Sequence, residues 1–375
     1  MKIGIDARLW NETGVGRYIR NLVKELQILD KKNEYILFVI SKDYELVKSQ
    51  INNKKFQIKI ANIHWHTVSE QQKFPKIIKK ENVDLMHFPY FSIPIFYNKP
   101  YVITIHDLIL NHFSTGKAST LFWIIYKIKH QAYKYILKSA VKNAKTIMVP
   151  LEAVKNDVKV TYHVPDSKIA VTYEGVDENL TRKGINKDIT RTLNKNKYFL
   201  YVGNAYPHKN INSLIKAFVE FRRDTGREVQ LLLVGKDDFF YKKLKSIIEP
   251  EHLSGITFKH DVTDDELENL YKSALAFISP SLMEGFGLPS LEALASSCLV
   301  LASDIPSFRE VMKDSAIYFD PYSITSIKEK MKYVYNLEQG TKDKYIKKGL
   351  ARVSEFSWEK MAEQTLQIYE SSISL

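Results

Sequence analysis

The chain has 375 residues, 45% of them apolar and 26% charged, which suits a folded protein with two α/β domains better than one. Its single cysteine, Cys298, excludes an intrachain disulfide and argues against a cysteine-based metal site. The sequence opens without a signal-peptide pattern, and the apolar run 121–126 ends at Lys127, far short of the roughly 20 residues a membrane-spanning helix needs. A reducing cytoplasm is therefore the expected location.

The net charge of +12 is unevenly distributed along the chain. Residues 1–150 carry 24 Lys and Arg against 11 Asp and Glu, whereas residues 151–375 carry 31 against 32. This asymmetry predicts an anionic partner for the first part: a membrane surface, a nucleic acid or a phosphorylated substrate. A basic surface that serves only solubility is the alternative.

Short apolar runs alternate with longer amphipathic stretches in the first part of the chain, as in the βαβ units of a parallel sheet. The predicted strands are Lys2–Asp6, Tyr35–Ile40, Val83–Phe88, Tyr101–His106, Thr146–Val149 and Lys168–Tyr173.

A second series of the same kind begins at Lys197. Its predicted strands are Tyr198–Val202, Val229–Val234, Ile256–Lys259, Leu275–Ile278, Leu299–Ala302 and Ala316–Phe319. Its predicted helices are Asn212–Arg223, Asp264–Ser273, Pro289–Ala295 and Ile324–Tyr335, followed by a last helix at Trp358–Ile368. The polar segment 178–196 is the predicted junction.

The fold class that follows is α/β, with two Rossmann-like, doubly wound parallel sheets. We expect domains at residues 1–178 and 197–355, and a C-terminal segment 356–375 that packs back on the N-terminal domain. Ligands of such sheets bind beyond the carboxyl ends of the strands, so the turns after strands are where functional residues are expected.

The most specific motif is Glu-Gly-Phe-Gly-Leu-Pro-Ser-Leu-Glu, which starts at Glu284 and follows a predicted strand. Gly285 and Gly287 permit a tight turn and a close approach to a ligand, and Pro289 suits a first helical turn. The start of a helix here would direct its free N–H groups and positive dipole end toward a diphosphate. Glu284, in the loop, and Glu292, on the first turn of the helix, are expected to accept hydrogen bonds from sugar or ribose hydroxyls. An ordinary glycine-containing loop before a helix is the alternative.

This string resembles the Glu-x7-Glu signature of retaining glycosyltransferase family 4, whose members have the GT-B fold of two Rossmann-like domains facing a cleft. The resemblance implies an acceptor-binding N-terminal domain and a C-terminal domain that binds a nucleotide-diphosphate sugar. It adds Phe286 and Leu288 to the expected donor-binding residues Glu284, Gly285, Gly287 and Glu292. It also implies that transfer needs no metal and no cofactor other than the nucleotide-sugar substrate.

The segment from Gly203 to Asn210 resembles the second phosphate-contacting loop of that family. Lys209 would pair with the donor diphosphate, and Asn204 stands where many members have an arginine. The segment His260-Asp261-Val262 resembles the loop that meets the nucleotide base, with Val262 as the contact but without the usual glycine. Ser297 and Leu299 likewise replace the usual glycine and proline. A solvated lysine in a turn is the alternative for Lys209.

Two segments of the N-terminal part also resemble family motifs. Gly14 and Gly16, before a predicted helix, would lie near the donor phosphate and the acceptor, although two glycines alone are weak evidence. His106 is expected near the donor sugar as a catalytic residue. Asp107 is expected to orient His106 or to meet the acceptor. A purely structural His–Asp pair is the alternative.

A basic helix is predicted between Phe113 and Lys145, a segment with seven lysines and no acidic residue. Lys127, Lys134, Lys138 and Lys145 fall within roughly 20° of one line at about 100° per residue. The interleaved aromatic residues are Phe122, Trp123, Tyr126, Tyr133 and Tyr135. The pattern favours contact with an anionic membrane surface, from the inner face of the plasma membrane, over an ordinary exposed helix. No nucleic-acid recognition motif accompanies it.

The hypothesis is a retaining hexosyltransferase that moves a sugar, mannose being favoured, to a lipid-linked or oligosaccharide acceptor in polysaccharide biosynthesis. Glu284 joins His106 and Asp107 as a candidate catalytic residue. No Asp-x-Asp motif occurs, which argues against a metal-dependent glycosyltransferase of the other common fold. The alternatives are a catalytically weakened nucleotide-sugar-binding protein and a basic nucleic-acid-binding protein. The base, the linkage and the oligomeric state are left open by the sequence.

Overall fold

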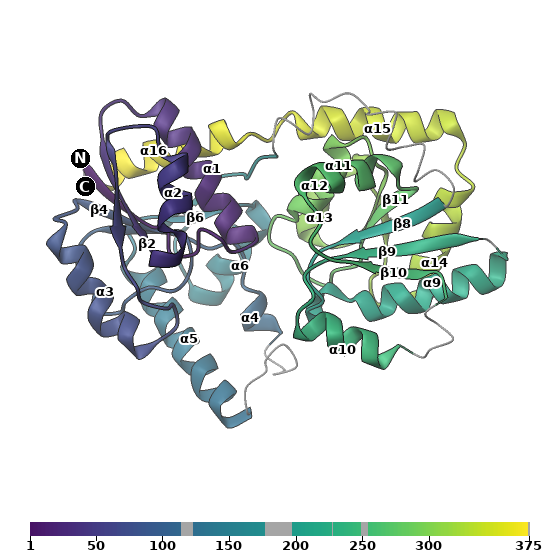
Figure 1. Cartoon of the computed structure of the whole chain (residues 1–375), viewed down its shortest axis with the longest axis horizontal. Helices are drawn as coiled ribbons and strands as arrows, with labels where there is room; N and C mark the ends of the chain where they lie inside the picture. The colour runs from purple at the N-terminus through teal and green to yellow at the C-terminus, as the bar shows by residue number, and fades with distance from the viewer. Residues whose placement is uncertain (114–122, 177–196, 227, 249–253, 374–375) are drawn as a thin grey trace. The chain divides into compact units, whose positions relative to one another are not determined.

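Two compact units form the chain in a computed structural model, which describes residues 1–113, 123–176, 197–226, 228–248 and 254–373 (Figure 1). The first unit consists of Met1–Gly175 and Ser357–Leu375, and the second of Val176–Phe356. The junction predicted at residues 178–196, as well as Phe122, lies outside the described ranges.

The first unit is built on a seven-stranded parallel sheet with the order β3-β2-β1-β4-β5-β6-β7. Its strands are β1 (Lys2–Asp6), β2 (Glu34–Val39), β3 (Phe56–Ile60), β4 (Leu85–Phe88), β5 (Tyr101–Thr104), β6 (Ile147–Val149) and β7 (Ile169–Val171). Its helices are α1 (Gly14–Leu29), α2 (Tyr44–Gln50), α3 (Val68–Lys80), α4 (Ile109–His112), α5 (Trp123–Asn143), α6 (Glu152–Tyr162) and α16 (Trp358–Ile373).

The second unit is built on a six-stranded parallel sheet with the order β10-β9-β8-β11-β12-β13. Its strands are β8 (Lys197–Val202), β9 (Val229–Val234), β10 (Ile256–Lys259), β11 (Ala276–Ser279), β12 (Val300–Ser303) and β13 (Ile317–Phe319). Its helices are α9 (Ile211–Thr225), α10 (Phe239–Ile247), α11 (Asp264–Ser273), α12 (Leu288–Ala295), α13 (Pro306–Met312), α14 (Ile324–Tyr335) and α15 (Gln339–Val353).

The strands are apolar along their length because helices cover both faces of each sheet. In β2, for example, every residue after Glu34 is buried. The α/β fold class with two doubly wound parallel sheets is thereby confirmed, and each predicted strand is present with ends shifted by a few residues. The edge strand β3 and the helices α10, α13 and α15 were not among the elements predicted from the sequence.

The C-terminal helix α16 packs against α1 within the first unit. Its Tyr369 hydroxyl lies 2.6 Å from Nδ1 of His87 on β4, and its Ser372 hydroxyl lies 3.3 Å from that of Thr146. The chain enters α16 beside Gly175, where an added Cβ would lie only 2.3 Å from the backbone nitrogen of Trp358. A glycine is therefore required where these two segments pass each other.

Strand order reverses once in each sheet, between β1 and β4 in the first unit and between β8 and β11 in the second. At such a reversal the loops that leave the two neighbouring strands diverge to opposite faces, and the space between them is where doubly wound sheets bind ligands. In the second unit these loops are residues 203–210 and 280–287, which contain the two most specific motifs of the sequence.

Candidate functional site

A lysine and a glutamate meet at the strand-order reversal of the second unit. Nζ of Lys209, in the loop after β8, lies 2.6 Å from Oε1 of Glu284, in the loop after β11. The hydroxyl of Ser281 donates to the same oxygen at 2.7 Å. The side chains of Lys209 and Glu284 are 18% and 11% exposed, so a ligand can reach a pair that is already shielded from most water. Both hydrogen bonds are therefore made to the same carboxylate oxygen, Oε1.

The two loops are fixed to each other through their backbones. The N–H of Leu282 donates to the carbonyl of His208 at 2.8 Å and joins the two loops. The hydroxyl of Ser307, on α13, donates to the carbonyl of Glu284 at 3.0 Å and anchors the second loop to that helix. These bonds hold the lysine and glutamate at a set distance before any ligand arrives, which is the preorganisation a binding site needs.

The helix α12 begins at the predicted place and for the predicted reason. Gly287 caps it with φ +78°, a left-handed conformation that favours glycine, and Pro289 stands in its first turn. A Cβ on Gly287 would lie 2.7 Å from the ring of Phe308, so packing as well as φ requires glycine here. Gly285, Phe286 and Leu288 are buried beside this turn.

Charge at the site is set by the Lys209–Glu284 pair. Burial alone would raise the pKa of Glu284, but the charge and hydrogen bond of Lys209, together with Ser281, hold this pKa below its usual range. Burial and the neighbouring Lys209 lower the pKa of His208 to about 4, so His208 is neutral at physiological pH. The pair is therefore an ammonium and a carboxylate with a neutral imidazole beside them.

Glu292 lies elsewhere than predicted, on the second turn of α12 rather than the first. Its carboxylate is buried, with the residue 4% exposed, and accepts a hydrogen bond from the Tyr271 hydroxyl at 3.2 Å. The helix starts at Leu288, one residue before the predicted start at Pro289, so Glu292 is the fifth residue of α12.

The remaining residues predicted to bind the donor occupy turns after the strands. The carboxamide oxygen of Asn204 accepts from the backbone N–H of Tyr206 at 3.4 Å, so this side chain folds back on its own loop. Val262 lies half-buried between β10 and α11. The predicted helix after Gly203–Asn210 is present as α9, preceded by a short 3₁₀ turn at Pro207–Lys209.

Two positions where the family pattern has glycine carry another residue here, and both adopt the left-handed backbone conformation that favours glycine. Asp261, in the loop where a glycine is usual, has φ +53°, and Ser297, which replaces a glycine, has φ +59°. Leu299, in place of a proline, is buried in the core of the second unit. The substitutions thus preserve the turns at the cost of strain in two non-glycine residues.

Gly14 and Gly16 lie inside the first turn of α1 rather than in a loop before it, which corrects the sequence analysis. A Cβ on Gly16 would lie 2.5 Å from the carbonyl oxygen of Trp10, so glycine allows the helix to pack on the preceding turn. Gly14 is exposed, with no atom within 4 Å of the position of an added Cβ. Packing therefore explains why residue 16 is a glycine, but it gives no reason for a glycine at position 14.

His106 is paired with a residue that the sequence analysis missed. Its Nδ1 lies 3.0 Å from Oε1 of Glu174, just after β7, and its Nε2 lies 3.0 Å from the carbonyl oxygen of Pro89. Asp107, the partner expected, instead accepts from the backbone N–H of Ile109 at the start of α4. Glu174 is 68 positions from His106, a separation at which sequence spacing gives no signal.

The helix α5 ends at Asn143, so Lys145 is not part of the predicted lysine stripe. Lys127, Lys134 and Lys138 lie on the helix and are exposed, together with Ile128 and Tyr135. Within the described residues, no helix is both long and apolar enough to cross a membrane.

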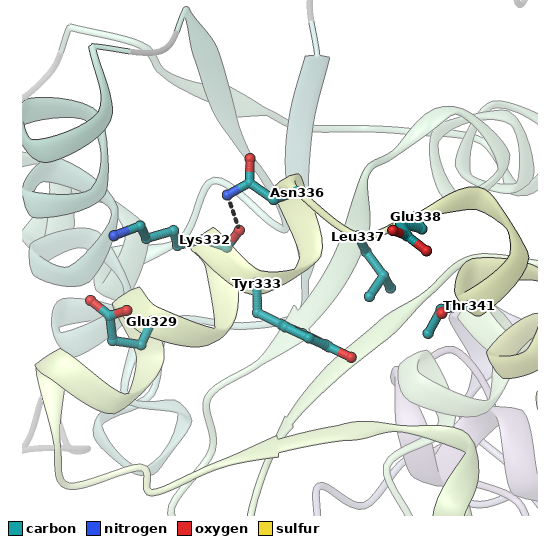
Figure 2. Close-up of a pocket in the computed structure, with 7 residues that line it drawn as sticks. All are labelled: Glu329, Lys332, Tyr333, Asn336, Leu337, Glu338 and Thr341. Atoms are coloured by element: carbon teal, nitrogen blue, oxygen red, sulfur yellow. Dashed lines mark hydrogen bonds between the residues drawn. The ribbon is translucent and has the colours of Figure 1, made fainter.

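A pocket also opens between the end of α14 and the start of α15, lined by Lys332, Tyr333, Leu337 and Thr341 among others (Figure 2). Nζ of Lys197, the first residue of β8, lies 5.0 Å from the ring centroid of Tyr335 at the end of α14, so this pocket lies near the amino ends of the strands. It is therefore at the opposite edge from the Lys209–Glu284 pair and contains none of the predicted site residues.

Comparison with known proteins gives the same assignment over nearly the whole chain. The family model of Glycosyltransferase Family 4 matches residues 13–180, and that of Glycosyl transferases group 1 matches residues 183–352. The O-antigen chain mannosyltransferase RfbU of Salmonella typhimurium is 30% identical over 294 residues, which cover 78% of this chain and 76% of that protein. O-antigen chain mannosyltransferase B of Escherichia coli is 26% identical over 374 residues, with 96% of each chain covered.

Among solved structures, HepE of Anabaena in complex with UDP and glucose aligns with a TM-score of 0.76 at 15% identity, covering 99% of this chain and 100% of that one. Two doubly wound parallel-sheet units, with the Lys–Glu pair at a strand-order reversal, define a glycosyltransferase of the GT-B class. Within that class, the chain belongs to glycosyltransferase family 4.

Proposed function

We propose that this glycosyltransferase transfers mannose from a nucleotide-diphosphate donor, GDP-mannose being favoured, to a lipid-linked or oligosaccharide acceptor in surface polysaccharide biosynthesis. The sugar and the pathway are supported by the relatives, which are O-antigen mannosyltransferases. The observation that carries the donor site is the Lys209–Glu284 pair beside the start of α12. The second unit then binds the donor, and the first unit contributes to the acceptor site.

Each residue of the pair has a chemical task in this proposal. The ammonium of Lys209 moves from Glu284 to the donor diphosphate and stabilises the negative charge that develops as the leaving group departs. The carboxylate of Glu284, released from the lysine, accepts hydrogen bonds from hydroxyls of the donor sugar. Glu292, with Tyr271 beside it, is assigned to the ribose of the donor. Lys209 and the helix N–H groups supply the positive charge, so the reaction needs no divalent metal.

The reaction proceeds with retention at the anomeric carbon. The acceptor oxygen forms the new bond to C1 as the bond from C1 to the phosphate oxygen breaks, and the acceptor proton passes to the departing diphosphate. No protein base is assigned to the groups at this pair, because both are weak proton acceptors: Lys209 and Ser281 hold the pKa of Glu284 below its usual range, and burial and Lys209 lower the pKa of His208 to about 4.

A donor screen with a product assay tests the proposal. Thermal denaturation is measured with GDP-mannose, UDP-glucose and dTDP-rhamnose, since a tightly bound donor raises the midpoint by mass action. Transfer to an acceptor in EDTA is then followed by NMR of the anomeric proton. The proposal expects a shift with GDP-mannose and an α-linked product from the α-linked donor. Donor binding without transfer would instead support a weakened binding protein.

The exposed face of α5 adds an anionic bilayer as a proposed partner. The N-terminal half of this helix extends beyond the rest of the first unit (Figure 1), and Ile128 and Tyr135 are each 65% exposed on it. With Lys127, Lys134 and Lys138 alongside, this face matches a surface that presents both phosphate headgroups and an apolar interior.

Sedimentation with vesicles tests the bilayer contact. Replacing Lys127, Lys134 and Lys138 with glutamine is expected to weaken binding to phosphatidylglycerol vesicles by about 3 kcal/mol, at about 1 kcal/mol per lysine. The matched control replaces exposed lysines of the second unit, Lys242, Lys243 and Lys332. Equal losses in the two triple variants would contradict a specific role for α5.

A further inference from the structure

Both ring nitrogens of His106 face hydrogen-bond acceptors. Its Nδ1 faces a carboxylate oxygen of Glu174 at 3.0 Å, and its Nε2 faces the backbone carbonyl of Pro89 at 3.0 Å. A carbonyl and an ionised carboxylate only accept hydrogen bonds. A neutral imidazole has an N–H on only one of its two ring nitrogens. The other nitrogen would then face an acceptor oxygen without a hydrogen to donate.

We propose that Glu174 is a positioning residue that holds His106 as an imidazolium at neutral pH, so that His106 offers the reaction a positive charge and not a base. This proposal deepens the function proposed above, because it defines what His106 can contribute to transfer. It concerns two residues of the first unit alone and can be tested without any substrate.

Burial strengthens the assignment. The side chain of Glu174 is 6% exposed and that of His106 is 15% exposed. A buried carboxylate is costly unless it is paired with a charge, and within the described residues the ionic partner of Glu174 is His106. Burial alone would lower the pKa of His106, but the hydrogen bond and charge of Glu174, with the Pro89 carbonyl, hold it above its ordinary value.

The other titratable groups that face His106 do not reverse this conclusion. Asp107, on the same loop, adds a negative charge that also raises the pKa of His106. The ring of Tyr18 from α1 packs edge-on at 4.9 Å between centroids, and burial raises the pKa of this phenol above its ordinary value, so it is neutral at pH 7. His87 on β4 is neutral, because burial lowers its pKa to about 3.

His87 provides an internal comparison of the same residue type in the same unit. Its nitrogens face the hydroxyls of Tyr369, at 2.6 Å, and Thr104, at 2.8 Å. A hydroxyl can donate or accept, so a neutral imidazole satisfies both contacts. The contrast between two hydroxyl partners and two acceptor partners therefore predicts opposite protonation states for His87 and His106.

A nitrogen NMR experiment on the full chain with labelled histidine tests the proposal. At pH 7 both nitrogens of His106 are expected to carry protons, whereas His87 shows one protonated nitrogen. In Glu174→Gln, His106 is expected to become a neutral imidazole at pH 7, with the His87 signals unchanged as evidence that the fold persists. A neutral His106 in the wild-type protein, or a His106 that stays charged in Glu174→Gln, would overturn the proposal.

A kinetic arm separates this inference from the proposed function. Where transfer is measurable, the alkaline limb of the kcat/KM profile is expected to move to lower pH in Glu174→Gln, and Glu174→Asp to restore part of the shift. An unmoved limb would contradict the role of His106 in transfer. If no nucleotide sugar is turned over, the proposed function fails while the NMR result still decides the charge of His106.

Discussion

Replacing Lys209 with methionine tests the donor site at the contact on which it depends. Methionine keeps much of the side-chain volume and removes the ammonium that lies 2.6 Å from Glu284. A hydrogen bond to a charged group contributes about 1.5–3 kcal/mol, so losing the same contact to a donor diphosphate should weaken binding roughly 10- to 150-fold. Isothermal titration with GDP-mannose measures this change.

The Lys209→Met variant should also lose stability, because Glu284 is left 11% exposed and without its cation. The matched control is Lys216→Met, which removes an exposed lysine of α9 in the same unit and should bind donor normally. A second variant, Lys209→Arg, keeps the charge and should retain most of the affinity. Donor affinity in Lys209→Met within twofold of the wild type would refute the assignment of this lysine to the diphosphate.

Three further predictions concern the turns and the buried histidine. Gly287→Ala should lower the free energy of unfolding, measured in urea, by roughly 2–5 kcal/mol. This figure adds the cost of a left-handed backbone at a non-glycine residue to the cost of overpacking against Phe308. Ser297→Gly should raise the free energy of unfolding by about 1 kcal/mol, because glycine adopts a φ of +59° without strain. The control Ala351→Gly, in α15, should lower it. A lower stability in Ser297→Gly would show that Ser297 is not strained. His87→Gln should flatten the fall in stability with acid. Burial lowers the pKa of His87 to about 3, so between this value and pH 6.5 the imidazole binds a proton in the unfolded chain but not in the folded one. The free energy of unfolding of the wild type therefore falls by about 1.4 kcal/mol per pH unit through this one group. Unfolding measured at pH 4.5, 5.5 and 6.5 would detect the loss of this slope in the variant.

Much of the fold could be predicted because helix-covered parallel strands leave a strong pattern of apolar runs. The elements that were not predicted have weak patterns: β3 is an edge strand with exposed Gln57 and Ile60, and the helix α15 buries only Gly349 and Val353 among its residues. The start of α12 at Leu288 was predicted to within one residue, because a left-handed glycine and a proline together fix a boundary that periodicity leaves open.

The sequence allowed the loops that carry the site to be predicted, but not which side chains pair within it. The motif around Glu284 and the loop at Lys209 were found from their positions after predicted strands and from their resemblance to family motifs. Their direct contact arises from the strand-order reversal between β8 and β11. The pairing of His106 with Glu174 depends on which strand ends adjoin in three dimensions, and local sequence offered Asp107 instead. Likewise Lys145 fits the angular pattern of α5 although the helix ends before it.

Hydrogen–deuterium exchange on the full chain, with and without saturating GDP-mannose, measures whether the donor binds at the loops after β8 and β11. Donor is expected to slow exchange in peptides covering residues 203–210 and 281–292, with no change around the pocket at residues 329–341. Protection confined to the α14–α15 pocket, or no protection at the loops after β8 and β11, would contradict it.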